Sequence, residues 1–155
     1  MSTVPNSYVT MADAEEYFSN RLDVAAWTEA SLELREQALV TATMALERYV
    51  WIGRVVDVNQ PLSWPRTGSF FDPRLGYTVD LSGIPQRIKT AQLELAYHYL
   101  NNDGVLDSGG GVSEVKVGPI HVKGIESPSI ASVVAQNYLA PLLASAGGRQ
   151  WWRAN

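Results

Sequence analysis

The stretch from Ser31 to Gly53, SLELREQALVTATMALERYVWIG, carries the strongest helix signal in the chain. It is rich in Ala, Leu, Glu, Arg and Met, contains no proline, and has its one glycine at the last position. Ser31 is a favourable amino-terminal cap, and glycine commonly follows the last residue of a helix. We therefore predict one long helix from Leu32 to about Ile52.

Apolar residues recur along this segment at helical spacing. One stripe consists of Leu34, Ala38, Ala42, Ala45, Tyr49 and Ile52, and Leu39, Leu46 and Val50 widen it. The three alanines leave room for a neighbouring helix to approach closely. We expect this helix to be buried on more than one side.

Three other segments have helical patterns, each with a recognisable start. The first is Met11 to Leu22 after a Thr10 cap, and the second is Pro85 to Asn101, with an apolar stripe of Ile84, Ile88, Ala91, Leu95 and Tyr99. The third is Ser129 to about Leu143, which Pro141 should kink or end. The connector at residues 23–30 contains Trp27, a side chain that we expect to be buried. The sequence therefore predicts about four helices.

Residues 54–83 interrupt the helical pattern with prolines, glycines and the aromatic pair Phe70-Phe71. We predict a long loop here. Loops above about 12 to 15 residues are uncommon in compact domains and are usually functional or ordered by a partner. The loop is therefore a candidate contact surface.

Residues 112–125 alternate apolar and polar side chains around Gly118-Pro119, which predicts a β-hairpin. The predicted fold class is mainly α: a compact helical bundle of about four helices with a long central loop, a small β-hairpin and a C-terminal arm. Residues 1–143 would form the helical domain, with the hairpin at about 112–125, and residues 144–155 would form the arm.

Composition excludes several classes of protein. The 155 residues suit a single domain, and the lack of cysteine excludes disulfide scaffolds, thiolate zinc sites and cysteine nucleophiles. His98 and His121 have no metal-ligand spacing, so we expect no enzyme activity, no metal and no cofactor. No apolar run is long enough to span a membrane, and residues 1–10 lack a secretory signal, so we expect the chain to start out in the cytosol.

The segment Gln60 to Gly68, QPLSWPRTG, holds the most informative residues of the loop. Proline fixes its own φ and restricts the residue before it, and an arginine can lie over an indole face. Trp64, Pro65 and Arg66 could therefore form a rigid plug. It could pack on its own domain or contact a partner, and the same alternatives apply to Phe70 and Phe71.

The C-terminal arm is the second candidate for partner binding. It contains Arg149, Trp151, Trp152 and Arg153, and adjacent tryptophans are costly to expose on a stable monomer. Tryptophan and arginine are enriched at binding hot spots. The arm could fold back on its own helices or dock into a neighbouring subunit, and we favour the neighbouring subunit.

A nucleic-acid interface can also be drawn from these residues. Trp64, Phe70 and Phe71 would stack bases, and the phosphate contacts would come from Arg54, Arg66, Arg74, Arg87 and Lys89. Residues 51–90 are net basic by two charges, whereas the whole chain has a net charge of -4. The composition gives this interpretation little support, because nucleic-acid-binding proteins usually have a basic excess.

Several motifs together resemble a known family. They are SYVTMADAEEYF (7–18), AAW (25–27), ALVTATMALERYVWIG (38–53), QPLSWPRTG (60–68) and IPQRIKTAQLELA (84–96), followed by the hairpin and a short helix. Over about residues 7–143 the chain resembles small tailed-phage proteins often labelled DnaT-like single-stranded-DNA-binding proteins. These look like head-tail connector, or adaptor, proteins.

This resemblance implies a structural adaptor without catalysis. About twelve copies would form a ring under the portal protein, the next neck or tail-completion protein would bind below, and DNA would pass through the lumen without sequence-specific binding. The protein would reside in the virion neck, and in the host cytoplasm during assembly. The alternatives are a single-stranded-DNA-binding DnaT-like accessory protein and an undetected enzyme.

Overall fold

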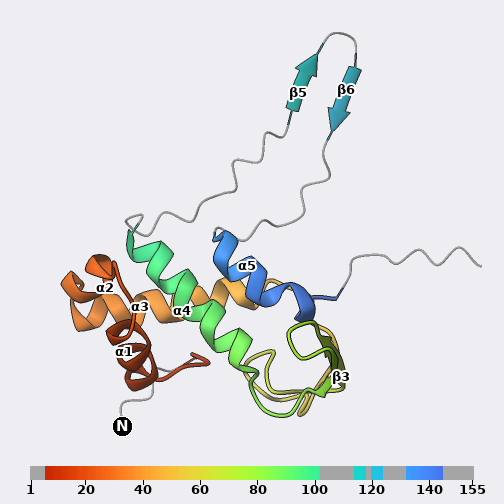
Figure 1. Ribbon diagram of the computed structural model, residues 1–155, viewed down its shortest axis with the longest axis horizontal. Coiled ribbons are helices and arrows are strands. Elements are labelled where there is room, and N and C mark those ends of the chain that lie inside the picture. Colours follow the sequence, from red (N-terminus) through yellow and green to blue (C-terminus); the bar gives the residue numbers. More distant parts are fainter. Residues whose placement is uncertain (1–5, 102–113, 118–119, 124–131, 145–155) are drawn as a thin grey trace, which may run out of the picture.

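The structure is a computed structural model that describes residues 6–101, 114–117, 120–123 and 132–144. Within these residues it contains helices and short strands (Figure 1). The helices are α1 (Met11–Ser19), α2 (Ala25–Glu29), α3 (Leu32–Leu46), α4 (Gln86–Asn101), α5 (Val133–Leu139) and the 3-10 helix η1 (Ala140–Leu142). The strands are β1 (Arg54–Val55), β2 (Arg66–Thr67), β3 (Ser69–Asp72), β4 (Tyr77–Asp80), β5 (Glu114–Val117) and β6 (Ile120–Lys123).

The prediction of a mainly α fold is wrong, because the described residues form a mixed α/β structure. β1 pairs with β2, β3 with β4, and β5 with β6, each as an antiparallel two-stranded sheet. Only the β5–β6 hairpin falls in a segment predicted to form strands. The other two sheets lie inside residues 54–83, which we predicted to be a loop.

Tight backbone packing explains how this segment forms strands. Gly53 and Gly68 both have positive φ, at 73° and 125°, which favours glycine. A Cβ atom at Gly53 would lie 2.3 Å from the Thr67 carbonyl oxygen, and one at Gly68 would lie 3.2 Å from the Gly53 Cα. The chain therefore crosses itself closely where β1 and β2 pair, and Leu81 closes the crossing by donating its N–H to the Gly68 carbonyl at 2.8 Å.

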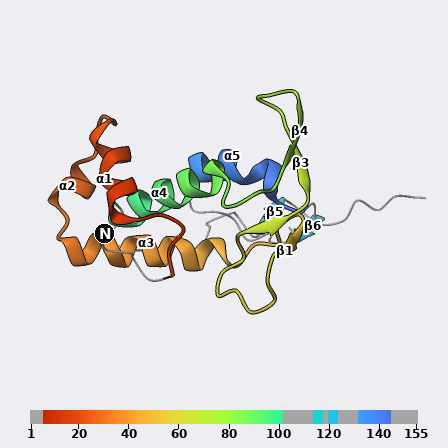
Figure 2. The ribbon, with the colours of Figure 1, turned by 90° about the horizontal axis from the view of Figure 1, so that it is seen from below.

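The body is elongated, and its two ends differ (Figure 2). Helices α1 and α2 lie at one end, and strands β1, β3 and β4 lie at the other. Helix α4 runs between these ends and packs against both α3 and α5. The core therefore surrounds α4.

Helix α4 confirms its predicted apolar stripe, since Ile88, Ala91, Leu95 and Tyr99 are all buried. The helix is also buried on its other faces. Its remaining buried residues are Arg87, Thr90, Gln92, Leu93, Glu94 and Ala96. Polar groups in such a position require hydrogen-bond partners.

Gln92 and Glu94 find those partners in other segments. The Gln92 amide nitrogen donates to the Leu39 carbonyl at 3.0 Å and to Ser7 Oγ at 2.6 Å, and its oxygen accepts from the Tyr8 N–H at 3.1 Å. Glu94 Oε1 accepts from the Tyr17 hydroxyl at 2.5 Å and from Arg21 Nη1 at 2.6 Å. These bonds fasten α1, α3 and the residues before α1 to one central helix.

The helix starts agree with the sequence better than the helix ends. Thr10 caps α1 in a capping box with Asp13, and Ser31 caps α3, both as predicted. Trp27 is buried in α2 and stacks on Phe18 with ring centroids 4.4 Å apart.

Three helix boundaries differ from the prediction. Helix α3 ends at Leu46 rather than Ile52. The residues after it bond to the C-terminal segment instead of continuing the helix. The Ile52 N–H donates to the Leu142 carbonyl at 3.1 Å, and the Ala144 N–H donates to the Val50 carbonyl at 2.9 Å. Helix α1 ends at Ser19 rather than Leu22. The last helix begins after a Ser132 cap rather than at Ser129, and it narrows to a 3-10 turn at Pro141.

Truncation of the core of α4 tests this architecture. Leu95 is only 1% exposed, so Leu95→Ala should lower the free energy of unfolding by about 2–5 kcal/mol, which urea denaturation followed by circular dichroism would measure. Leu22 is 91% exposed, and Leu22→Ala should change stability by no more than about 0.5 kcal/mol. Equal effects of the two substitutions would show that α4 is not central.

Candidate nucleic-acid interface

We use the name ribbon end for residues 54–80, which contain β1 to β4. Within it, Trp64 packs against Trp51, which precedes this segment. Trp64 is 2% exposed and meets Trp51 edge to face, with ring centroids 5.8 Å apart. The peptide bond between Trp64 and Pro65 is cis. Of the two predicted roles of Trp64, the structure therefore shows packing on its own domain.

Arg66 connects the residues around Trp64 to the segment that follows α3. Its guanidinium donates to the carbonyl oxygens of Ile52 at 2.7 Å and Gly53 at 2.8 Å, with longer bonds to Ser63 and Trp51. The sequence allowed Arg66 to lie over the Trp64 indole, and in the structure its donors are directed at backbone carbonyls. Arg66 is therefore a structural clamp and not a free cation.

Strand β3 contains both Phe70 and Phe71, and it directs their side chains to opposite faces. Phe70 is 9% exposed and faces the core, whereas Phe71 is 58% exposed, because successive residues of a strand point to opposite faces. The register places Phe71 opposite Thr78 and Asp72 opposite Tyr77. Of the pair, only Phe71 is available to a ligand.

The turn between β3 and β4 adds exposed residues that sequence reasoning missed. Leu75 is 49% exposed and Tyr77 is 59% exposed. Asp72 closes the turn by accepting the N–H groups of Leu75 and Gly76 on its carbonyl, and Gly76 has a φ of 74°. The sequence DPRLG at residues 72–76 is a turn signal from which this hairpin could have been predicted.

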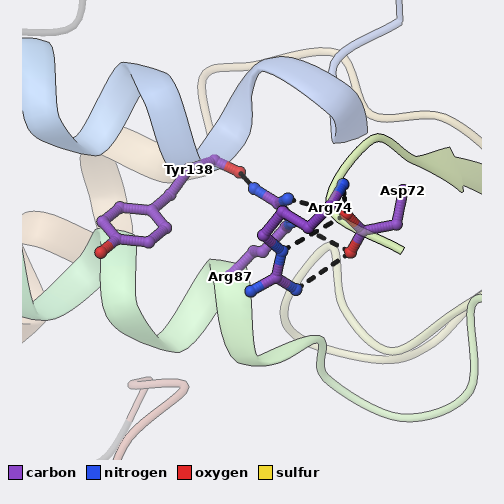
Figure 3. A network of polar contacts seen from close by, with 4 residues as sticks. All are labelled: Asp72, Arg74, Arg87 and Tyr138. Carbon is purple, nitrogen blue, oxygen red and sulfur yellow. Dashed lines mark hydrogen bonds and ion pairs between the residues drawn. The ribbon is translucent and has the colours of Figure 1, made fainter. Parts of the chain in front are cut away.

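A buried ion pair fixes the hairpin to the helices (Figure 3). Asp72 accepts from Arg87 Nη2 at 2.9 Å, and the side chains of both are less than 10% exposed. Arg87 also donates to the Tyr138 carbonyl at 3.5 Å, so one guanidinium connects β3, α4 and α5. Arg87 is thus structural and is not available to phosphates.

Arg74 approaches the same carboxylate from the solvent side. Its Nη2 lies 3.0 Å from Asp72 Oδ2, yet its side chain is 64% exposed. Hydrogen bonds from Arg74 and Arg87 hold the pKa of Asp72 well below its usual value. Because Arg87 neutralises Asp72 as well, Arg74 can turn toward an anion without leaving a buried charge unpaired.

The predicted cations therefore divide into two groups. Arg54 and Arg74 are exposed at the ribbon end, while Arg66 and Arg87 are held by internal bonds. Lys89 is half-buried in a groove between α1 and α4. The predicted arm residues Arg149, Trp151, Trp152 and Arg153 lie outside the described residues.

Among the described residues, no group of three or more His, Asp or Glu side chains is placed to hold a metal ion. No helix in these ranges is both long enough and apolar enough to cross a membrane.

Comparison with known proteins identifies the family. Residues 2–154 match the family described as "Putative DnaT-like ssDNA binding protein". The chain belongs to this family. No curated protein and no solved structure matches the chain. Membership in the DnaT-like family agrees with one part of the resemblance seen in the sequence, and the connector role is left as a proposal.

Protonation of Asp72 should weaken the fold of this DnaT-like protein. The folded pKa of Asp72 lies below its ordinary value of 3.8, so the pairing contributes stability above about pH 4 that is lost as the pH falls further. Asp72→Asn should destabilise the protein at pH 7 and flatten the loss of stability below pH 4. Urea denaturation at pH 7, 4 and 3 measures both effects.

Arg74→Gln is the matched control, because it removes the exposed partner and leaves Arg87 in place. It should destabilise the protein less than Asp72→Asn at pH 7. If Asp72→Asn were as stable as the wild type, the ion pair would not fasten the hairpin.

Proposed function

We propose that this protein binds single-stranded DNA through the ribbon end. Membership in the DnaT-like family supports a DNA-binding role. We place the DNA-binding site at the ribbon end because exposed aromatic rings and exposed guanidinium groups both occur in this segment. Proteins that bind single strands combine such rings, on which bases stack, with cations that follow the backbone.

The observation that carries this proposal is the distribution of arginines. In the described residues, Arg21, Arg35, Arg66 and Arg87 are bound to carboxylates or carbonyls of the protein. Arg48, Arg54 and Arg74 are exposed. Arg74 lies in the turn between β3, which exposes Phe71, and β4, which exposes Tyr77, and it also contacts Asp72. Arg54 lies on the neighbouring β1–β2 sheet, and Arg48 lies outside the ribbon end. Phe71 and Tyr77 lie on opposite faces of the β3–β4 hairpin, because Tyr77 pairs with Asp72 and not with Phe71. A single strand on the Phe71 face could stack a base on that ring and place a phosphate near Arg74.

The opposite end of the body would orient the strand. Residues 11–29, which contain α1 and α2, hold five acidic residues and one basic residue, for a net charge of -4, and these helices lie away from the ribbon end (Figure 2). Like charges would keep the phosphate backbone away from those helices. We therefore propose a short binding site with a small number of phosphate contacts.

Substitutions at the ribbon end separate stacking from charge. Phe71→Ala should weaken binding of a fluorescent oligothymidine by about 1–3 kcal/mol with no change in salt dependence, because a stacking contact is lost. Arg74→Ala should reduce the slope of log affinity against log salt by about 0.7, because one phosphate contact is lost. Fluorescence anisotropy at several salt concentrations measures both.

Two controls accompany this titration. Arg74→Lys keeps the positive charge and should keep the salt slope, and Leu22→Ala lies away from the ribbon end and should leave binding unchanged. Wild-type protein that does not bind the oligonucleotide at low salt would contradict the proposal.

A ring-forming head-tail connector is the second candidate function. Leu34 and Met44 are at least half exposed on α3, and Val133 and Val134 are exposed on α5. Because α3 and α5 pack on α4 from different directions, these two apolar faces differ in sequence and in position. A contact between two different faces repeats from copy to copy and can close into a ring.

In this second proposal the ring would hold about twelve copies in the virion neck. The portal protein and the next neck or tail-completion protein would be its partners, and DNA would pass through the lumen.

Charge introduced on the apolar faces tests self-association. Met44→Asp or Val133→Asp should shift the wild-type oligomer toward monomer in analytical ultracentrifugation, because burying an unpaired carboxylate is costly. Leu22→Asp adds the same charge at a side chain outside both faces and should leave the mass unchanged. A monomeric wild-type protein over the whole concentration range would contradict the ring.

A further inference from the structure

A groove between α1 and α4 is not used by the proposed DNA-binding function. Its volume is about 620 Å³, which lies within the range of ligand-binding pockets. Its wall is formed by Val9, Asp13, Glu16, Tyr17, Asn20, Arg21, Gln86, Lys89 and Leu93. Its apolar floor is small, because Val9 and Leu93 are buried and Tyr17 is half-buried, and its rims are charged.

The charges of the groove sum to a net negative value. Arg21 is neutralised by the buried Glu94, whose carboxylate lies 2.6 Å from Arg21 Nη1. Asp13 and Glu16 then outnumber Lys89. Hydrogen bonds from Thr10 lower the pKa of Asp13, which keeps this carboxylate ionised. The groove thus favours a cationic occupant with apolar side chains.

One segment of the chain has this chemistry. Residues 145–155, SAGGRQWWRAN, contain two arginines, two tryptophans and no acidic residue. We propose that this C-terminal arm binds in the α1–α4 groove of its own chain. Arg149 and Arg153 would lie near Asp13 and Glu16, and Trp151 and Trp152 would pack over the half-buried Tyr17, because Val9 and Leu93 are only 3% and 2% exposed.

The described part of the chain ends within reach of the groove. Tyr138 accepts a hydrogen bond from Arg87 in the first turn of α4, and Ala144 follows six residues later beside Val50. Lys89, which lines the groove, is two residues after Arg87 on α4. To reach the groove the arm has to pass around this helix, which is about 10–12 Å across with its side chains. Arg149 and Trp151 lie five and seven residues beyond Ala144, so an extended chain carries them roughly 16–18 Å and 23–25 Å from it. Both spans exceed the width of α4.

A tether of this length favours binding within the chain over binding to a second copy. A segment held near its site has an effective concentration in the millimolar range, well above ordinary protein concentrations. Docking also removes apolar surface of the two indole rings from water, which is favourable, whereas in a free arm both rings stay exposed to water.

Crosslinking in the full-length protein tests the proposal directly, since the chain has no natural cysteine. In the Asn20→Cys/Ala154→Cys variant, a short bis-maleimide should link the groove to the arm within one chain, which protease digestion and mass spectrometry would detect. The Met44→Cys/Ala154→Cys variant places the first cysteine on the exposed face of α3 and should crosslink at least tenfold less.

A mixture of the two single-cysteine variants, Asn20→Cys and Ala154→Cys, distinguishes the occupants. We expect no crosslinked dimer. A crosslinked dimer would overturn the proposal in favour of the arm of a second copy, and equal crosslinking at Asn20 and Met44 would overturn it in favour of an undocked arm.

A charge reversal tests recognition in the same assay. Glu16→Lys should lower the crosslinking rate several-fold, and adding Arg149→Glu and Arg153→Glu should restore part of that loss. Glu33→Lys on α3 is the matched control and should have no effect. An unchanged rate in Glu16→Lys would contradict the assigned contacts. None of these readouts involves DNA, so they are independent of the proposed DNA-binding function.

Discussion

The structure depends on the burial of α4 on all sides, which places polar groups of this helix away from water. A buried amide or charge is costly unless it is hydrogen-bonded, so the buried polar side chains of α4 need partners in other segments. Gln92 bonds to the residues before α1 and to the backbone of α3, Glu94 bonds to α1, and Arg87 bonds to β3 and α5. The polar residues of one helix therefore fix the positions of its neighbours.

Both candidate surfaces follow from this constraint. Arg87 binds Asp72, and Asp72 also contacts Arg74 at the turn of the hairpin that carries Phe71, the ring proposed to stack a base. Glu94 binds Arg21 and Tyr17, and burial raises the pKa of the Tyr17 phenol, which remains a hydrogen-bond donor. This second set lies along the α1–α4 groove and leaves the groove with a net negative charge. Arg87 and Glu94, about two turns apart on α4, thus support two surfaces of different chemistry.

Local signals in the sequence predicted the caps at Thr10 and Ser31 and the apolar stripe of α4, because these depend on residues a few positions apart. The strands of the ribbon end were missed, since each is two to four residues long and is defined by its pairing. The end of α3 was misplaced because Trp51 and Ile52 bond to residues about 90 positions later. Residue types suggested a DNA-binding set, but only the structure separates exposed Phe71 and Arg74 from buried Phe70 and Arg87.

Hydrogen-deuterium exchange of the full-length protein, with and without a saturating single-stranded oligothymidine at low salt, tests the central claim most directly. If the ribbon end binds the strand, amides within residues 54–80 should exchange more slowly in the presence of the oligonucleotide, and those of α1 and α2 should be unchanged. Protection confined to α1 and α2, or no protection anywhere, would contradict the account.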